Sequence, residues 1–197
     1  MSSYMPGATA VGMVFKGGVV VAAEKRVSYG TYVVSRTGRK VFKIADKVGA
    51  ACAGLVGDMQ ILMREVASYV KIRELELRRS LPPNSVAKLL SVIMFERRFA
   101  PFITQIVIGG VNGQPSVYVL DPLGSVIPDK YASVGSGAEI AIGVIEAEYA
   151  EGMSEEDAKN LTVKSIRSAV QRDAASGDGV DIMTITANGI KEESINF

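Results

Sequence analysis

Histidine is absent from this sequence of 197 residues, which excludes several familiar kinds of active site. Ser-His-Asp and Cys-His catalytic groups cannot be built without an imidazole, and neither can zinc sites that depend on histidine ligands. The one cysteine, Cys52, cannot replace histidine in such a site. Acyl-transfer chemistry in this chain would therefore need a lysine, a carboxylate or a free α-amino group as its base.

A single cysteine also excludes an internal disulfide. Cys52 lies in the apolar run 48–54, and this setting favours a small buried side chain over a reactive thiol. From this cysteine usage we expect an intracellular protein, located in the cytoplasm.

Long apolar runs and strong charge imbalance are missing too. No apolar run approaches the roughly 18 residues of a membrane-spanning helix. The net charge is +1, from 22 basic and 21 acidic residues, so neither a membrane nor nucleic acid is an expected partner. The short basic pairs at 78–79 and 97–98 are typical of solvated helix faces.

The composition, with 48% apolar and 22% charged residues, is that of a globular protein. The first seven residues lack the basic and apolar regions of a secretory signal. We expect residues 1–7 to be a short propeptide or tail and residues 8–197 to form a single domain. No metal and no organic cofactor is expected.

Apolar patterning divides the chain into alternating blocks of strands and helices. A hairpin with its turn at Gly17-Gly18 opens the chain, and helices are predicted to begin at Asp58, at Asn84 or Ser85, after Gly137, and at Ser154. The predicted strands cover residues 10–15, 19–23, 31–35, 41–44, 48–54, 103–109, 116–120 and 180–186, with a further short strand before Tyr131 and a last strand after the turn at Asn188-Gly189. Because strict βαβ alternation is missing, the order favours an α+β fold in which two antiparallel sheets lie between two helical layers.

Five stretches, in order along the chain, carry a resemblance to a known family. They are Thr9–Arg26, Arg39–Ile44, Ala53–Asp58, Tyr131–Gly137 and Arg172–Gly179. Together they resemble the β subunits of the proteasome core particle, of archaeal type, in the threonine-protease family. The resemblance implies a four-layer αββα sandwich with the N-terminal-nucleophile hydrolase fold. It also implies α-ring subunits and other β subunits as partners, and unfolded polypeptides as substrates.

The nucleophile position is where the sequence departs from this family. The family's catalytic threonine aligns with Ala8, whose methyl group cannot attack a carbonyl or drive cleavage after Gly7. Thr9 carries the nearest hydroxyl. Successive side chains of a strand point to opposite faces, so Thr9 would face away from Lys40 unless the first strand slipped or bulged by one residue.

The resemblance also implies roles for residues around this position. Lys40 would lie beside the nucleophile, where its positive charge lowers the pKa of a neighbouring group. Without the resemblance, it reads as one more surface lysine. Glu24 stands where the family usually has aspartate, and its extra methylene is expected to loosen the contact with Lys40. Gly54 would supply a backbone N–H to the oxyanion.

Three further polar residues, Ser136, Asp173 and Ser176, match the network around the free α-amino group. Ser136 could equally cap the third helix, and Ser176 could belong to a turn. Positions that shape the substrate groove are matched by Ser28, Cys52 and Val56, with Cys52 at the floor of a small apolar specificity pocket.

Three hypotheses about activity stay open at this point. The chain is a catalytically silent β subunit that retains residues 1–7. Alternatively, it is a threonine endopeptidase that uses Thr9 after residues 1–8 are removed. In the third hypothesis, Ala8 is an engineered replacement for threonine that traps the precursor.

Overall fold

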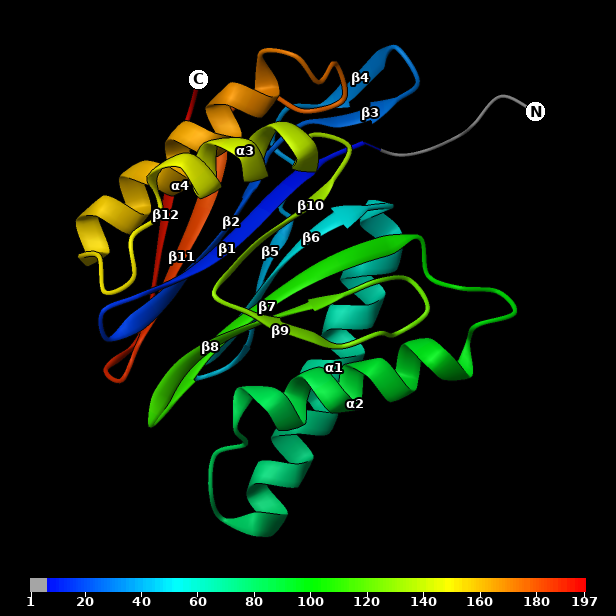
Figure 1. Cartoon of the computed structure of the whole chain (residues 1–197). Coiled ribbons are helices and arrows are strands. Elements are labelled where there is room, and N and C mark those ends of the chain that lie inside the picture. Colours follow the sequence, from blue (N-terminus) through cyan, green and yellow to red (C-terminus); the bar gives the residue numbers. More distant parts are fainter. Residues whose placement is uncertain (1–6) are drawn as a thin grey trace.

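A computed structural model describes residues 7–197, so the predicted tail over residues 1–7 lies outside the described part except for Gly7. The described residues form two five-stranded antiparallel sheets and a separate two-stranded ribbon. A pair of helices covers the outer face of each large sheet (Figure 1). The α+β, four-layer αββα sandwich expected from the order of elements is therefore confirmed.

The first sheet has the strand order β10-β1-β2-β11-β12. Its strands are β1 (Thr9–Phe15), β2 (Gly18–Glu24), β10 (Tyr131–Gly135), β11 (Val180–Thr186) and β12 (Gly189–Ile195). The predicted hairpin of β1 and β2 is present, but its turn residues are Lys16 and Gly17. Gly17 has φ +94°, a conformation that glycine adopts without steric cost. Since β1 lies between β10 and β2, both edges of its backbone are paired, and its side chains pack between the sheets on one face and against α3 and α4 on the other.

The second sheet has the order β5-β6-β7-β8-β9. Its strands are β5 (Val41–Ala45), β6 (Val48–Gly54), β7 (Thr104–Asn112), β8 (Gln114–Leu120) and β9 (Ile127–Asp129). The ribbon of β3 (Val27–Tyr29) and β4 (Tyr32–Ser35) stands apart from both large sheets (Figure 1).

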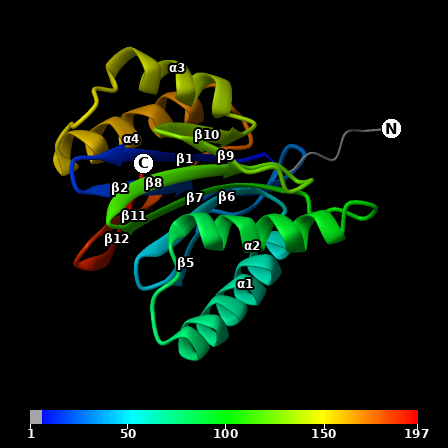
Figure 2. The ribbon, with the colours of Figure 1, turned by 60° about the horizontal axis from the view of Figure 1, so that its bottom comes forward.

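Three apolar clusters separate the four layers, which Figure 2 shows from a second side. The helices are α1 (Val56–Leu77), α2 (Pro83–Glu96), α3 (Ala138–Glu148) and α4 (Glu155–Val170). Leu90 of α2 and Ile106 of β7 belong to the cluster between α1, α2 and the second sheet. Ile145 of α3 and Met13 of β1 belong to the cluster between α3, α4 and the first sheet. The middle cluster, with Val107, joins the sheets. None of the helices in residues 7–197 is long and apolar enough to cross a membrane.

The start of α1 differs from the prediction. The helix begins at Val56, and its N-cap is Leu55 rather than Asp58. Asp58 lies in the first turn, where its carboxylate accepts a hydrogen bond from the Ile103 N–H at 2.7 Å. This carboxylate therefore ties the helix to the segment that leads into β7, and it still lies near the positive end of the helix dipole.

The other predicted helix starts agree more closely with the structure. The second helix begins at Pro83, one residue before the predicted Asn84, and proline is well suited to a first helical position because its missing N–H needs no partner there. Ser154 is the N-cap of α4 as predicted, with its hydroxyl oxygen accepting a hydrogen bond from the Asp157 N–H at 3.1 Å.

Candidate active site

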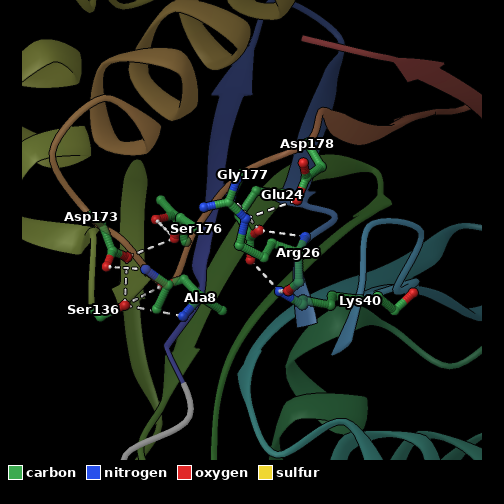
Figure 3. Close-up of polar contacts among 12 residues, drawn as sticks. Ala8, Glu24, Arg26, Lys40, Ser136, Asp173, Ser176, Gly177 and Asp178 are labelled. Atoms are coloured by element: carbon green, nitrogen blue, oxygen red, sulfur yellow. Dashed lines mark hydrogen bonds and ion pairs between the residues drawn. The ribbon is translucent and has the colours of Figure 1, made fainter. Parts of the chain in front are cut away.

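Ala8 lies immediately before β1 and is completely buried. Its backbone N–H donates to the hydroxyl of Ser136 at 3.1 Å, and its carbonyl oxygen lies 3.3 Å from the same hydroxyl. Figure 3 shows Ala8 beside the group formed by Ser136, Asp173 and Ser176, with Lys40 on its other side in this view. The start of β1 is thus surrounded by the polar side chains that the sequence singles out.

Asp173 is the centre of this polar group. It follows the end of α4, and one of its carboxylate oxygens, Oδ2, accepts hydrogen bonds from the hydroxyls of Ser136 and Ser176, each at 2.6 Å. Its other oxygen accepts from the Ala175 N–H at 3.1 Å. The structure therefore unites Ser136, Asp173 and Ser176 around the Ala8 backbone. Ser136 makes no side-chain cap of α3, whose N-cap is Gly137.

Thr9 faces the opposite side of β1 from Ala8. Ala8 belongs to the cluster between the two sheets, whereas Val11, the residue two after Thr9, packs toward α3 and α4. The Thr9 hydroxyl lies 2.8 Å from the Ser176 hydroxyl and is completely buried. Because Ser176 gives its only hydroxyl proton to Asp173, Thr9 must donate its own proton to Ser176.

Glu24 and Lys40 form an ion pair that is almost entirely buried, with side-chain exposures of 0% and 1%. Glu24 lies at the end of β2 and Lys40 just before β5. The Lys40 ammonium also donates to the Arg26 carbonyl at 2.5 Å. The extra methylene of Glu24 does not keep it from Lys40, so the expected loosening of this contact is wrong. Lys40 is likewise not a surface lysine.

The Glu24 carboxylate is well supplied with donors despite its burial. Its second oxygen, Oε2, accepts from the N–H groups of Arg26 at 2.7 Å and of Gly177 at 2.8 Å. Burial raises the pKa of the Glu24 carboxyl, and the charge of Lys40 and the backbone donors oppose that rise. The pair thus links β2, the segment before β5 and the loop after α4.

Gly54 ends β6 at a place that no other residue fits easily. Its φ is +138°, and a Cβ atom there would lie 2.2 Å from the Ile103 carbonyl oxygen. A pocket of about 270 Å³ opens beside it, with Ser136, Ile103 and Pro122 among the lining residues. Gly54 and Ser136, assigned to different roles from the sequence, therefore border one cavity.

The three residues matched to the substrate groove lie apart from that pocket. Cys52 is completely buried in the cluster under α1 and α2, and burial raises the pKa of its thiol. This fits the small buried side chain expected from the sequence. Val56 is the first residue of α1, and Ser28 lies on β3, both partly exposed. That these residues shape a substrate groove stays a prediction.

Asp178 is a site residue that sequence reasoning missed. Its carboxylate accepts from the Arg26 side chain at 2.8 Å, and its φ is +67°. Asp178 and Arg26 both lie in stretches that carry the family resemblance, but the resemblance assigns neither of them a role, and by itself the end of the stretch that contains Asp178 reads as a stop signal after a helix. The combination of an aspartate with two glycines in a tight loop was the available signal, because aspartate tolerates positive φ better than most residues.

We expect Asp178→Asn to lower the free energy of unfolding by an amount that depends on pH. The hydrogen bond and charge of Arg26 hold the pKa of Asp178 below its ordinary value of 3.8. A carboxyl whose pKa is lowered on folding stabilises the folded state above its ordinary pKa, and that stabilisation is lost as pH falls through the folded value. The variant should be less stable at pH 7 by about 1 kcal/mol, and the difference should shrink as the pH is lowered below 3.8 and through the lowered pKa. Urea unfolding at pH 7 and at a series of acid pH values checks this, and a pH-independent difference would contradict it.

Among residues 7–197, no group of three or more histidine, cysteine, aspartate or glutamate side chains is arranged to hold a metal ion. The charged residues of the site are instead bonded to one another and to the backbone. What the arrangement offers chemically is a buried ammonium, a carboxylate with two hydroxyl donors, and a pocket beside a glycine.

The layered sandwich with polar groups converging on the start of β1 is the architecture of the N-terminal-nucleophile hydrolases. The family described as "Proteasome subunit" matches residues 5–185. The chain therefore belongs to the proteasome subunit family, and its relatives identify it as a β-type subunit of the archaeal kind.

Several relatives match almost the full length of this chain. It is 56% identical to "Proteasome subunit beta 1" of Cenarchaeum symbiosum over 188 residues, covering 95% of this chain and 97% of the relative. It is 54% identical to the protein of the same name from Nitrosopumilus maritimus, covering 98% and 97%. It is 48% identical to "Proteasome subunit beta 2" of Pyrobaculum calidifontis, covering 97% and 95%.

Proposed function

We propose that this chain is a β-ring subunit of the proteasome core particle that builds the wall of the degradation chamber without cleaving peptide bonds itself. The observation that carries this proposal is Ala8. It lies where Ser136 and Asp173 converge, and its side chain has no hydroxyl. Lys40 and Glu24 would then maintain the shape of the site, with no nucleophile for them to activate.

The partners that we propose are α-ring subunits, other β subunits and unfolded polypeptides. Membership of the proteasome subunit family supports a place in the stacked rings. We propose the cytoplasm as its location, where a free buried thiol such as that of Cys52 stays reduced.

Intact-mass measurement of this subunit within the assembled particle tests whether the chain is catalytically silent. Removal of residues 1–7 by the subunit itself needs a hydroxyl at position 8, so we expect them to remain attached. Loss of the first seven or eight residues in a particle that contains no other protease would overturn the proposal.

A threonine endopeptidase that uses Thr9 is the second candidate function. The only observation in its favour is a hydroxyl one residue beyond Ala8. That hydroxyl faces α3 and α4 and donates to Ser176, so it could act only after β1 shifted by one residue. Such a slip would turn every side chain of β1 to its opposite face and disrupt two apolar clusters.

We expect Thr9→Val to change stability and nothing else. Valine has nearly the shape of threonine but leaves the Ser176 oxygen without its hydrogen-bond donor. The free energy of unfolding should therefore fall by roughly 1–3 kcal/mol. Neither the parent nor the variant should be labelled by a threonine-directed covalent inhibitor. A matched control is Thr162→Val, because Thr162 is equally buried but its hydroxyl has no hydrogen-bond partner among the described residues. Labelling of the parent that Thr9→Val abolishes would favour the endopeptidase instead.

A further inference from the structure

Arg26 lies just after β2, between the two halves of the candidate site. Its backbone belongs to the half that contains Glu24 and Lys40. The Arg26 N–H donates to Glu24 at 2.7 Å, and the Arg26 carbonyl accepts from the Lys40 ammonium at 2.5 Å. Any displacement of the Arg26 backbone would therefore move the groups that hold the lysine in place.

The side chain of Arg26 reaches into the other half, the loop between α4 and β11. Its Nε donates to Asp178 at 2.8 Å, and its Nη1 donates to the Ala174 carbonyl at 3.0 Å. The guanidinium also lies directly against Gly177, where a Cβ atom would be 2.3 Å from Nη2 and 2.4 Å from Cζ. The single guanidinium thus contacts three residues of this loop, and Figure 3 shows Arg26 beside Gly177 and Asp178.

This loop carries two of the polar groups that surround Ala8. Asp173 immediately precedes Ala174 and Ser176 lies two residues after it, so fixing the loop also fixes them. β11, which follows this loop, pairs with β2 from Val180 and Glu24 onward. Within the loop itself, Gly177 makes two hydrogen bonds to the end of β2 and the residue after it: its N–H donates to the Glu24 carboxylate at 2.8 Å, and its carbonyl accepts from the Lys25 N–H at 3.1 Å. Both of these contacts depend on the place of Gly177, the residue that Arg26 covers.

We propose that Arg26 is a positioning residue that sets Asp173 and Ser176 relative to Lys40. The contact needs a guanidinium, since one flat group must cover Gly177 and donate in two directions at once. Lysine has a single compact charge and cannot do both. This inference rests on the proposed function only in placing these groups around the nucleophile position. It does not depend on whether the chain is catalytically silent.

The first test uses the protein with Ala8 in place. Arg26→Lys should speed hydrogen exchange at the Gly177 and Lys25 amides by about tenfold or more, because it removes a charged hydrogen bond and the cover over Gly177. The matched control is Arg39→Lys, since Arg39 forms a comparable ion pair with Glu192 at 2.7 Å on the surface. The control should leave both amides unchanged.

The second test separates positioning from general stability. In the Ala8→Thr protein, Arg26→Lys should lower kcat for a peptide substrate by about tenfold or more and leave KM within twofold. This split is expected because Arg26 does not line the pocket between Gly54 and Ser136. Gly177→Ala should produce the same defect, and the double variant should be no worse than either, since both act through one contact.

The outcomes distinguish this proposal from the proposed function. If Ala8→Thr gives no peptidase, the register assigned to Ala8 is wrong, and the exchange measurement alone decides the role of Arg26. Unchanged exchange at Gly177 overturns the proposal, as does an unchanged kcat in an active Ala8→Thr protein. Should Arg26→Lys fail to assemble, Asp178→Asn removes one partner and keeps the guanidinium, and a smaller change in the same direction is expected.

Discussion

Ala8→Thr is expected to convert this chain into a self-processing peptidase. The substitution places a hydroxyl at the point where the Ser136 and Asp173 side chains already converge on the backbone of residue 8. Cleavage after Gly7 would then free an α-amino group that can serve as the base. The chain should lose seven residues, and the particle should gain hydrolysis of a fluorogenic peptide where the parent subunit contributes none.

Mass spectrometry of the subunit and a peptidase assay check this expectation. Ala8→Val is the matched control, because valine has the shape of threonine without the hydroxyl, and it should give neither cleavage nor hydrolysis. Adding Lys40→Ala to Ala8→Thr should abolish both activities, since the ammonium would be lost beside the new hydroxyl. An Ala8→Thr protein that assembles but retains its N-terminus would contradict the assignment of Ala8 to the nucleophile position.

The same variant bears on how the alanine arose. If Ala8 stands in place of a natural threonine, the rest of the site must be complete, and Ala8→Thr should be fully active. If the alanine is natural, supporting residues have been free to change. Glu24 in place of the family's usual aspartate is one such change, yet it still bonds Lys40 and the Gly177 N–H. The supporting contacts are thus intact on either view.

Long apolar patterns made most of the fold predictable from the sequence. The β1–β2 and β7–β8 hairpins have glycine at their turns, and the four helices have clear apolar faces. Two short strands escaped prediction. β3 has only three residues and pairs only with β4, and β10 is the stretch that reads as a motif before a helix. Elements this short are determined by their partners in space, which local sequence does not specify.

The candidate site was predictable only where a family motif marked each residue. Ser136, Asp173 and Ser176 come from distant parts of the chain, and no local rule brings a hydroxyl from before α3 to a carboxylate after α4. The ion pair between Arg26 and Asp178 joins residues that are 152 positions apart, so it could be recognised only in the folded structure. In contrast, the direction of Thr9 followed from the alternation of a strand alone.

Breaking the buried Glu24–Lys40 pair is expected to produce the largest loss of stability. Lys40→Ala leaves a carboxylate at 0% exposure without its counter-charge. Removing one partner of a buried ion pair typically costs about 3–5 kcal/mol, because the remaining charge stays desolvated. Two backbone N–H groups still reach Glu24, so we expect the lower part of that range. Urea unfolding at one fixed protein concentration measures the loss, since assembly also raises apparent stability.

Two further variants separate the buried charge from the contact itself. Glu24→Gln with Lys40→Met keeps the side-chain volume and one side-chain oxygen that can accept from the backbone N–H groups, but it removes both charges. This double variant should recover more than half of the lost stability, because no unpaired charge remains. Lys130→Ala breaks an ion pair of 2.7 Å that lies in solvent, with exposures of 61% and 76%, and it should change stability little. If Lys40→Ala were as mild as Lys130→Ala, the ammonium would not be needed to keep the buried Glu24 carboxylate stable, and its backbone donors alone would be sufficient.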